Sequence, residues 1–467
     1  MHIQPERIKT LNDKAVQDGK YVLYWMQNAQ RAECNHALEL AIARANDLNK
    51  PLLVAFGLMD NFPEANMRHY WFMLEGLQDV EQQLLKRGIK FALYYGLPPK
   101  VAIQLSKDAC LVVTERGYLR ILKVWREKVA KEITCPLIQV ETDVVVPLDV
   151  VSDHTEFAAR TLRPKITKQL EKYLRDLKET PLKHKSLSLE LSALDLDTLD
   201  LSDISKLAYS LKLNQDVQAV PQFFQGGTTK AKQVLDTFLQ KRFKTYTQNR
   251  NQPQTDDTSY MGMYLHYGQI SPIYIAQRIL QEGQGQENIE SYIEELIVRR
   301  ELAMNFVNFT KDYDSFECLP AWAKKTLQAH EKDKREDVYL REQLEQAQTH
   351  DPYWNAATNE MRFTGYMHNY MRMYWGKKIL EWSKTPQEAF ETALHLNNKY
   401  FLDGRDANSF TGVAWCFGMH DRPWGDRAVF GMVRYMNASG LEHKADPKSY
   451  VKKIERLMAG AEQPTLF

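Results

Sequence analysis

Two polar segments near the carboxyl end of the chain decide the fold: Leu402-Asp-Gly-Arg-Asp-Ala-Asn408 and His420-Asp-Arg-Pro-Trp-Gly-Asp-Arg427. They lie within residues 351–440, a stretch that also holds Trp354, Trp375, Trp382, Trp415 and Trp424, five of the nine tryptophans. Tryptophans at helical spacing usually belong to a hydrophobic core. Because a plain core does not place Arg, Asn and Asp among them, this stretch predicts a buried site that is both polar and aromatic.

One expected helix, residues 366–382, carries the clearest polar and aromatic stripe. Trp375 and Trp382 are seven residues apart, which is two helical turns or about 10.5 Å along the axis. Arg372 shares their face, and Asn369 lies one further turn back. The two tryptophans alone are typical of core packing. Together with Arg372 they favour a bound planar cofactor with polar edges.

The side chain of Arg372 also predicts a partner. A buried guanidinium group requires a carboxylate. Asp403 and Asp406 are the nearest candidates in the sequence. The polar turn that holds both is therefore expected to close over the same site.

The overall composition is that of an ordinary globular protein. Of 467 residues, 44% are hydrophobic, and 61 basic residues nearly balance 60 acidic ones, so the global charge does not indicate nucleic acid. There is no apolar run of about 18 residues and no apolar amino-terminal segment, so we expect no membrane span and no secretory signal. The five cysteines are scattered and form no CxxC pair, which indicates a reducing compartment without disulfides or a zinc site. We expect a cytoplasmic monomer without a metal ion.

The first 150 residues alternate short apolar runs with helical patterns, of which residues 67–86, ended by Gly88, form the clearest helix. Such alternation predicts a Rossmann-like parallel sheet, although no GxGxxG follows the first run. Trp25-Met-Gln-Asn28 lies where a ligand would bind at the ends of the strands, and a surface turn is an equal alternative. The expected strands are Tyr21-Val-Leu-Tyr-Trp25, Leu52-Leu-Val-Ala-Phe56, Phe91-Ala-Leu-Tyr-Tyr95 and Leu111-Val-Val-Thr114.

The character of the sequence changes over residues 180–210, where short Leu, Asp and Ser repeats replace helical periodicity. We interpret this part as a connection between domains. From about residue 225 onward nearly all of the sequence has a helical pattern. The sequence therefore predicts an α/β domain over residues 1–180, a linker over 181–224 and an all-α domain over 225–467.

Start and stop residues set the expected helix boundaries in the all-α part. Asp351 is expected to cap a helix that Pro352 begins and Gly365 ends, and Thr385-Pro-Gln-Glu388 is a capping box. Residues 331–349 are expected to be a solvated helix face or a loop. The other expected helices are one after Gly226-Gly227 containing Val234, Phe238 and Phe243, and those over residues 291–309, 319–330, 366–382 and 426–437.

Six segments together resemble class II cyclobutane pyrimidine dimer photolyases, a branch of the photolyase/cryptochrome superfamily. The resemblance spans nearly the whole chain, and its motifs are specific. The segments are Tyr264-Leu-His-Tyr-Gly-Gln-Ile-Ser-Pro272, Glu294-Glu-Leu-Ile-Val-Arg-Arg-Glu-Leu302, Asp351-Pro-Tyr-Trp-Asn-Ala356, Met367-His-Asn-Tyr-Met-Arg-Met-Tyr-Trp375, Leu402-Asp-Gly-Arg-Asp-Ala-Asn408 and His420-Asp-Arg-Pro-Trp-Gly425.

The resemblance implies an amino-terminal α/β antenna domain and an all-α domain that holds FAD in a U shape. It implies a light-driven DNA repair enzyme. The reduced flavin absorbs near-UV or blue light and passes an electron to a flipped-out pyrimidine dimer, the cyclobutane ring opens, and the electron returns. The implied partner is UV-damaged DNA, single- or double-stranded. The implied antenna chromophore is a deazaflavin or a folate, and the antenna domain without a chromophore is a further alternative.

The same resemblance assigns residues to the flavin. Arg372 and Asp403 correspond to the ion pair beside the isoalloxazine ring, and Asn397 to the amide that faces flavin N5, with Asn408 as the second candidate. In the phosphate-contacting turn, Gly262 stands where the family usually has a hydroxyl side chain. The residues assigned to FAD are Tyr246, Arg250, Thr258, Ser259, Tyr260, Asn369, Arg372, Asp403, Asp406 and Asn408.

An electron path and a substrate pocket follow from the resemblance as well. Trp354, Trp375 and Trp382 correspond to the tryptophans that reduce the flavin in light. The pocket would use Glu295 to bond the dimer, with Met373 as its floor and Trp415 as one wall.

The second wall of the pocket is a tryptophan in many relatives. Arg299 occupies that region here, and its guanidinium plane can stack in place of a ring. DNA phosphates would meet a local basic face. Its expected members are Arg299, Arg422, Arg427, Arg434 and Lys444, whereas Trp424 has no firm assignment.

Two other functions fit part of the sequence. A cryptochrome-like blue-light sensor shares the fold, but it would be expected to carry a long extension beyond Phe467 and to vary at Glu295, Met373 and Trp415. A light-independent nucleotide-binding enzyme would account only for the amino-terminal half. Hydrolytic motifs such as GxSxG and HExxH are absent from the sequence.

Overall fold

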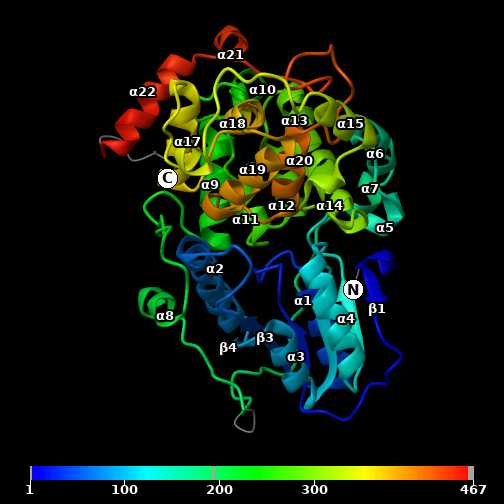
Figure 1. Cartoon of the computed structure of the whole chain (residues 1–467). Helices are drawn as coiled ribbons and strands as arrows, with labels where there is room; N and C mark the ends of the chain where they lie inside the picture. Colours follow the sequence, from blue (N-terminus) through cyan, green and yellow to red (C-terminus); the bar gives the residue numbers. More distant parts are fainter. Residues whose placement is uncertain (1–2, 192–194, 461–467) are drawn as a thin grey trace.

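The computed structural model describes residues 3–191 and 195–460, and its amino-terminal part is built on a single sheet. Six strands pair in the order β1-β6-β5-β2-β3-β4, and all pairs except β1–β6 are parallel. The predicted parallel sheet is therefore confirmed. Figure 1 shows it below the helical part. The strands are β1 (Ile8–Thr10), β2 (Tyr21–Trp25), β3 (Leu52–Leu58), β4 (Lys90–Tyr95), β5 (Ala109–Glu115) and β6 (Leu137–Val140).

The four strands predicted from apolar runs are all present. Strands β2, β3 and β5 are buried at every residue, which is why their sequences show no alternation of polar and apolar positions. Strands β1 and β6 were not predicted. They have only three and four residues, so their pairing depends on the neighbouring strands rather than on a local pattern.

Two layers of helices cover the sheet. Val22 and Tyr24 of β2 share a hydrophobic cluster with α1 and α2. Tyr21 and Leu23 point to the other face and pack with α3 and with Val129 of α4. The helices are α1 (His36–Leu48), α2 (Met67–Lys86), α3 (Pro98–Ser106) and α4 (Arg120–Glu132).

The rest of the described chain is largely helical, and its helices, apart from α8, share one continuous core. The main elements are α5 (Leu148–Val151), α6 (Ala159–Thr167), α7 (Leu170–Tyr173), α8 (Ile204–Ser210), α9 (Thr228–Lys241), α10 (Tyr246–Asn249), α11 (Gly262–His266), α12 (Pro272–Glu282), α13 (Gln286–Ile293), η3 (Glu294–Arg299), α14 (Arg300–Phe309), α15 (Ala321–Ala329), α16 (Arg341–Glu345), α17 (Pro352–Thr364), α18 (Asn369–Trp382), α19 (Pro386–Tyr400), α20 (Ala407–Cys416), α21 (Ala438–Lys444) and α22 (Pro447–Met458).

The connection between the two parts has its own organisation. Helices α5, α6 and α7 precede it and pack into the core of the helical part, beside α14 (Figure 1). Beyond Tyr173 the chain runs back along the sheet, where Thr198 forms an isolated bridge with Tyr94 of β4. Helix α8 then packs against α2.

The predicted caps of α17 and the N-cap Thr385 of α19 are confirmed, but for the predicted capping box of α19 only the Thr385 half is observed among the described residues. The Asp351 carboxylate accepts hydrogen bonds from the backbone N–H groups of Tyr353 and Trp354 at 2.9 and 3.1 Å. Gly365 ends α17 in the left-handed region, at φ 78°. The Thr385 hydroxyl accepts from the N–H of Glu388 at 3.1 Å. Each cap satisfies backbone groups that the helix itself cannot.

Three helix predictions were wrong in part. The expected helix over residues 426–437 is absent, because Val429 and Gly431 adopt positive φ values of 69° and 50° within a tight turn. Helix α9 ends at Lys241, so Phe243 lies in a separate 3-10 turn. The expected helix over 291–309 is divided by η3, a π-helical segment.

Two properties concern the described residues as a whole. Within residues 3–191 and 195–460, every helix is too short or too polar to cross a membrane. The same residues contain no group of three or more His, Cys, Asp or Glu side chains arranged to hold a metal ion.

Candidate functional site

A cavity of about 640 Å³ lies inside the helical part, among η3, α14, α18, α19 and α20. We call it the central cavity. It brings together most of the site residues predicted from the sequence. Those that line it are Arg250, Glu295, Arg299, Asn369, Arg372, Met373, Trp375, Asn397, Asp403, Asn408, Trp415 and Arg434.

An ion pair crosses one side of the central cavity. Arg372 Nη1 lies 2.9 Å from Asp403 Oδ1, and both side chains are about one-fifth exposed, at 22% and 21%. Arg372 Nε also donates to the backbone oxygen of Met367 at 3.0 Å, and the guanidinium group lies 3.9 Å from the ring centroid of Phe401. The expected carboxylate partner is therefore Asp403 and not Asp406.

Gly262 faces the same ion pair. A Cβ atom at this position would lie 3.0 Å from Asp403 Oδ2, closer than most real contacts. The missing hydroxyl side chain therefore leaves room for the Asp403 carboxylate beside the first turn of α11.

Three amides contribute further polar edges. Asn397 Nδ2 donates to Asn398 Oδ1 at 3.0 Å and makes a short hydrogen bond to the hydroxyl of Ser409. Asn408 Nδ2 donates to Asp406 Oδ2 at 2.9 Å. Asn369, at the start of α18, also lines the cavity. Two of these side chains are thus already fixed by protein partners.

Glu295 is fixed at the opposite side of the cavity. Arg250 Nη2 donates to Glu295 Oε1 at 2.6 Å, and Arg250 Nη1 donates to Ser291 Oγ at 2.7 Å. Glu295 lies in η3, and π-helical turns are frequent at functional sites because they displace a side chain from the regular helical position. No sequence pattern revealed this segment.

Four of the predicted FAD residues stand behind the cavity wall. Tyr246 lies beneath the Arg250 guanidinium group, 5.7 Å from carbon to ring centroid. Thr258 Oγ1 lies 3.3 Å from the hydroxyl of Tyr366, which lines the cavity. Tyr260 has a positive φ of 54° and donates to Asp256 Oδ1 at 3.0 Å. Ser259 belongs to the same turn. Thr258 and Tyr260 therefore reach the cavity through Tyr366, whereas Tyr246 reaches it through Arg250.

The three predicted path tryptophans are in contact, in an order that helix spacing did not reveal. Trp375 and Trp354 stack with ring centroids 6.3 Å apart and planes 7° apart. Trp354 then meets Trp382 edge to face at 5.6 Å. Trp354, from α17, therefore connects two tryptophans of α18. At the outer end, Trp382 contacts Tyr339 and His350, each at 5.4 Å.

The mouth of the central cavity is aromatic and basic. Met373, Trp415 and Arg434 line both this cavity and a second hollow of about 350 Å³. Arg422 and Arg434 lie over the Trp424 ring at 5.1 and 4.2 Å. Arg427 and Lys444 line the second hollow too. The basic residues that are expected to contact DNA phosphates, apart from Arg299, therefore lie around Trp424.

Arg299 lines the central cavity but not the second hollow. Its side chain is 51% exposed, and Nε lies 3.1 Å from Glu294 Oε1. The pair is solvated, so its contribution to stability is small.

Comparison with known proteins identifies the family. A family model described as DNA photolyase matches residues 22–184. The chain is 47% identical over 457 residues to the deoxyribodipyrimidine photo-lyase of Methanothermobacter thermautotrophicus, covering 98% of this chain and 99% of that protein. The chain belongs to the DNA photolyase family.

Other photolyases extend the relationship. The Arabidopsis thaliana enzyme of the same name is 37% identical, with 98% of this chain and 94% of that protein covered. A class III photolyase from Agrobacterium tumefaciens and a cryptochrome from Synechocystis each superimpose with a TM-score of 0.72 at 17% identity, covering 96% of this chain and 89% and 90% of theirs. A Sulfolobus tokodaii photolyase, described as containing two FAD molecules, superimposes with a TM-score of 0.70 at 14% identity, covering 95% of this chain and 92% of that one. These structures share the photolyase fold.

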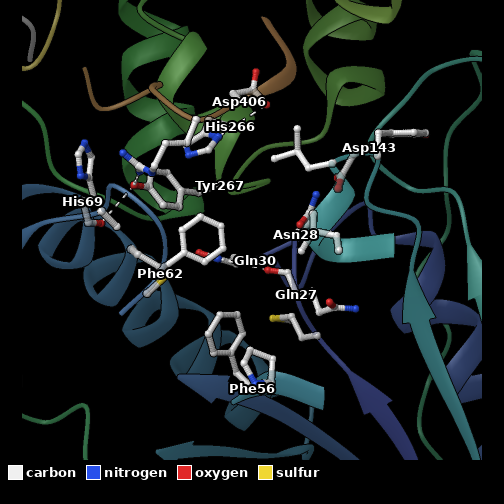
Figure 2. A pocket seen from close by; sticks show the side chains of 18 of the residues that line it. Gln27, Asn28, Gln30, Phe56, Phe62, His69, Asp143, His266, Tyr267 and Asp406 are labelled. Atoms are coloured by element: carbon white, nitrogen blue, oxygen red, sulfur yellow. Dashed lines mark hydrogen bonds and ion pairs between the residues drawn. The ribbon is translucent and has the colours of Figure 1, made fainter. Parts of the chain in front are cut away.

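A further cavity of this photolyase lies between the sheet and the helical part, and Figure 2 shows it from close by. We call it the interdomain cavity. Gln27 and Asn28, just after β2, and Phe56, in β3, reach it from the sheet, while His266 and Tyr267 reach it from α11 and the turn that follows. The segment Trp25-Met-Gln-Asn28 therefore does end at a cavity. His69, Tyr118, Trp125 and Arg300 also line it, and sequence patterns gave no sign of them.

Asp406, assigned to FAD by resemblance, lies at the interdomain cavity (Figure 2). Its carboxylate caps α20 by accepting from the N–H of Asn408 at 3.1 Å and lies 3.6 Å from His266 Nδ1. Burial alone would raise the pKa of Asp406, but the close contact with His266, the charge of His266 and the hydrogen bond from Asn408 lower it below its usual range. Asp406 therefore lines a different cavity from Arg372.

Asp406→Ala is expected to lower the free energy of unfolding by about 2 kcal/mol at pH 7, because it removes both the cap and the His266 contact. The lowered pKa means that this stabilisation is fully present above the usual carboxyl pKa of about 4 and is lost as the pH falls from there through the lower pKa of the folded state. Urea unfolding at pH 7 and at about pH 2 measures the effect. If the free energies of unfolding of wild type and variant differed by the same amount at both pH values, the assigned role of the Asp406 charge would be contradicted.

Proposed function

We propose that this photolyase repairs cyclobutane pyrimidine dimers in UV-damaged DNA, using light and reduced FAD bound in the central cavity, as class II photolyases do. The observation that carries the proposal is that Arg372–Asp403, Glu295 and the inner end of the Trp375–Trp354–Trp382 path meet in one cavity. An ordinary core would not bring an ion pair, a carboxylate and a tryptophan chain together.

The residues of the central cavity fit a flavin. Asp403 Oδ1 is buried and accepts no hydrogen bond of good geometry, although it lies in ion-pair contact with Arg372. Such an atom can take a donor from a bound ring. The Asn397 amide can bind another edge of the flavin ring, because it can either donate or accept a hydrogen bond. Met367, Phe401 and Val413 provide apolar walls.

Reduced FAD, once bound, supplies the electron on absorbing near-UV or blue light. The protein's contribution is to bind, orient and exclude water. Arg372 and Asp403 would orient the ring system, while Arg250 holds Glu295 ready to accept hydrogen bonds from the dimer bases. Met373 and Trp415 would form the floor and wall against which the dimer rests. Electrons from outside would enter through Trp382.

DNA would be held at the basic mouth. Arg422, Arg427, Arg434 and Lys444 can each meet a phosphate, and Arg299 can stack its guanidinium plane on a base. Extruding a dimer requires only a few kcal/mol, because damaged bases stack poorly.

Replacing Arg427 or Lys444 by Gln is expected to weaken binding of a dimer-containing duplex and to reduce the dependence of log K on log salt by about 1 per residue removed. Binding in the dark at several salt concentrations measures this slope. Lys128→Gln on α4 is a suitable control, because this lysine is 45% exposed and α4 lies beside the sheet, outside the helical part that holds the mouth (Figure 1). An unchanged slope in the mouth variants would contradict the proposed DNA surface.

We further propose that the interdomain cavity holds an antenna chromophore, a deazaflavin or a folate. Its apolar and aromatic lining suits a planar ring system, and His266, Asp143 and Arg300 offer polar contacts. Its position outside the carboxyl ends of parallel strands is where α/β sheets usually bind ligands.

One assay tests the main proposal. The purified protein is checked for a flavin spectrum, reduced, and illuminated with DNA that contains thymine dimers. Loss of dimers in light but not in darkness is the expected result. A bound flavin without dimer loss would overturn the repair function and favour a cryptochrome-like sensor. Absence of any flavin would overturn both.

A further inference from the structure

Lys377 is a buried lysine to which neither the flavin nor the tryptophan path gives a role. It lies in α18, is 0% exposed, and donates from Nζ to the backbone oxygen of Cys416 at 2.5 Å. Among residues 3–191 and 195–460, no carboxylate lies within ion-pair distance of it. Because lysine is almost never fully buried unless it is paired, packing alone does not explain this residue.

The ammonium group of Lys377 lies directly behind the wall of the central cavity. Nζ is 5.4 Å from the ring centroid of Trp415, and Trp415 and Cys416 both line the cavity. Cys416 ends α20, where the helix dipole favours a cation. At Gly376, a Cβ atom would come within 2.6 Å of Cys416 Sγ, so α18 and α20 are in close contact beside Lys377.

The charges around this wall do not cancel. Arg434 also lies over the Trp415 ring, at 5.7 Å, and its Nε is 3.3 Å from Asp421 Oδ2. Burial lowers the pKa of His420 to about 4 and raises that of Cys416 to about 11, so both are neutral near pH 7. Two cations, Lys377 and Arg434, therefore face one carboxylate, Asp421.

We propose that Lys377 is a positioning residue of the dimer pocket, whose ammonium group fixes Trp415 and places a positive charge beside the point where the dimer accepts an electron. This inference rests on the proposed repair function. The electron makes the dimer an anion, two carbon–carbon bonds break, and the electron leaves again. Lys377 exchanges no proton, and its fixed charge in a water-poor site lowers the energy of the anion.

The charge on Lys377 also sets an upper pH limit. Burial lowers its pKa to about 8, an effect that Asp421 opposes and Arg434 reinforces. The positive charge is therefore present below about pH 8 and lost above it. Since Cys416 titrates only at higher pH, loss of the charge near pH 8 is attributable to Lys377.

The test uses FAD-loaded, pre-reduced full-length protein and a short oligonucleotide with one thymine dimer, from pH 6.5 to 9.5. Two quantities are measured: dimers split per absorbed photon, and affinity in the dark. In wild type we expect the splitting yield to fall roughly tenfold, with a midpoint near pH 8, while dark affinity changes by less than about twofold. Lys377→Met should give the low yield at every pH, and Lys377→Arg should keep the high yield at pH 9.5.

Lys378→Met is the matched control, since this neighbouring lysine of α18 is paired with Glu381 at 2.7 Å and lies over the rings of Tyr374 and Trp382 rather than that of Trp415. It should retain the wild-type pH profile. If wild type splits no dimer at any pH, the repair function itself fails. If wild type repairs with a flat pH profile, or if Lys377→Met equals wild type at pH 7, the role of Lys377 is overturned. If Lys377→Met does not fold, the comparison of wild type with Lys377→Arg still tests the inference. Identical dependence of the splitting yield on pH in these two proteins would overturn it.

Discussion

Trp354→Phe is expected to slow light-driven reduction of bound flavin by at least about a hundredfold, since a phenyl ring is far harder to oxidise than indole and each 1.36 kcal/mol of added barrier is tenfold in rate. The variant removes the link between Trp375, at the cavity, and Trp382, near Tyr339 and His350. Repair by chemically pre-reduced protein should remain within about twofold, because Trp354 does not line the central cavity.

Transient absorption in the presence of a reductant measures the rate of flavin photoreduction. Dimer loss after chemical reduction of the flavin measures repair. Trp382→Phe should also slow flavin reduction and spare repair. Trp322→Phe is a suitable control, because Trp322 is half-buried against the same core but has no ring contact with the path. Equal loss of photoreduction and repair in Trp354→Phe would contradict the assigned path. A photoreduction rate of Trp354→Phe within threefold of wild type would also contradict the assigned path.

Asp403→Asn is expected to weaken FAD binding by roughly a hundredfold, or about 2.7 kcal/mol. The change keeps the shape of the side chain but leaves the Arg372 guanidinium group, 22% exposed, without its carboxylate. Breaking a buried pair costs about 3–5 kcal/mol, and partial exposure reduces this figure. The variant also loses an acceptor that a flavin edge can use.

Flavin release during dialysis and titration of the stripped protein with FAD give the affinity. Glu345→Gln is a matched control, since Glu345 pairs with Lys399 at 2.6 Å with side chains 19% and 25% exposed, and neither residue lines the central cavity. It should bind FAD as wild type does. An Asp403→Asn variant that retains wild-type affinity would show that the ion pair serves only the packing of α18 against the turn.

Features governed by neighbouring residues could be predicted from the sequence. Asp351, Gly365 and Thr385 mark helix ends because each acts on backbone groups within four residues. The Arg372–Asp403 pair could be predicted because a buried guanidinium group needs a carboxylate. This requirement predicted a contact between two residues that are 31 positions apart in the sequence.

Features that depend on distant parts of the chain could not be predicted from the sequence. Strand β1 exists only because β6 offers an edge. The turn at Val429 depends on Asp333, whose carboxylate accepts from the Val429 N–H at 2.9 Å. Trp354 lies between Trp375 and Trp382 because α17 crosses α18 there, a fact that spacing along one helix does not contain.

Helix α20 begins at the boundary between two cavities. Asp406 and Ala407 line the interdomain cavity, and Asn408 and Ser409 line the central one. Four consecutive residues therefore form a partition between the two binding spaces. As a consequence, the amino-terminal half is not an interchangeable module. A chimaera that took its amino-terminal domain from a relative would place different side chains against these four residues, and compensating substitutions would be needed in the helical part.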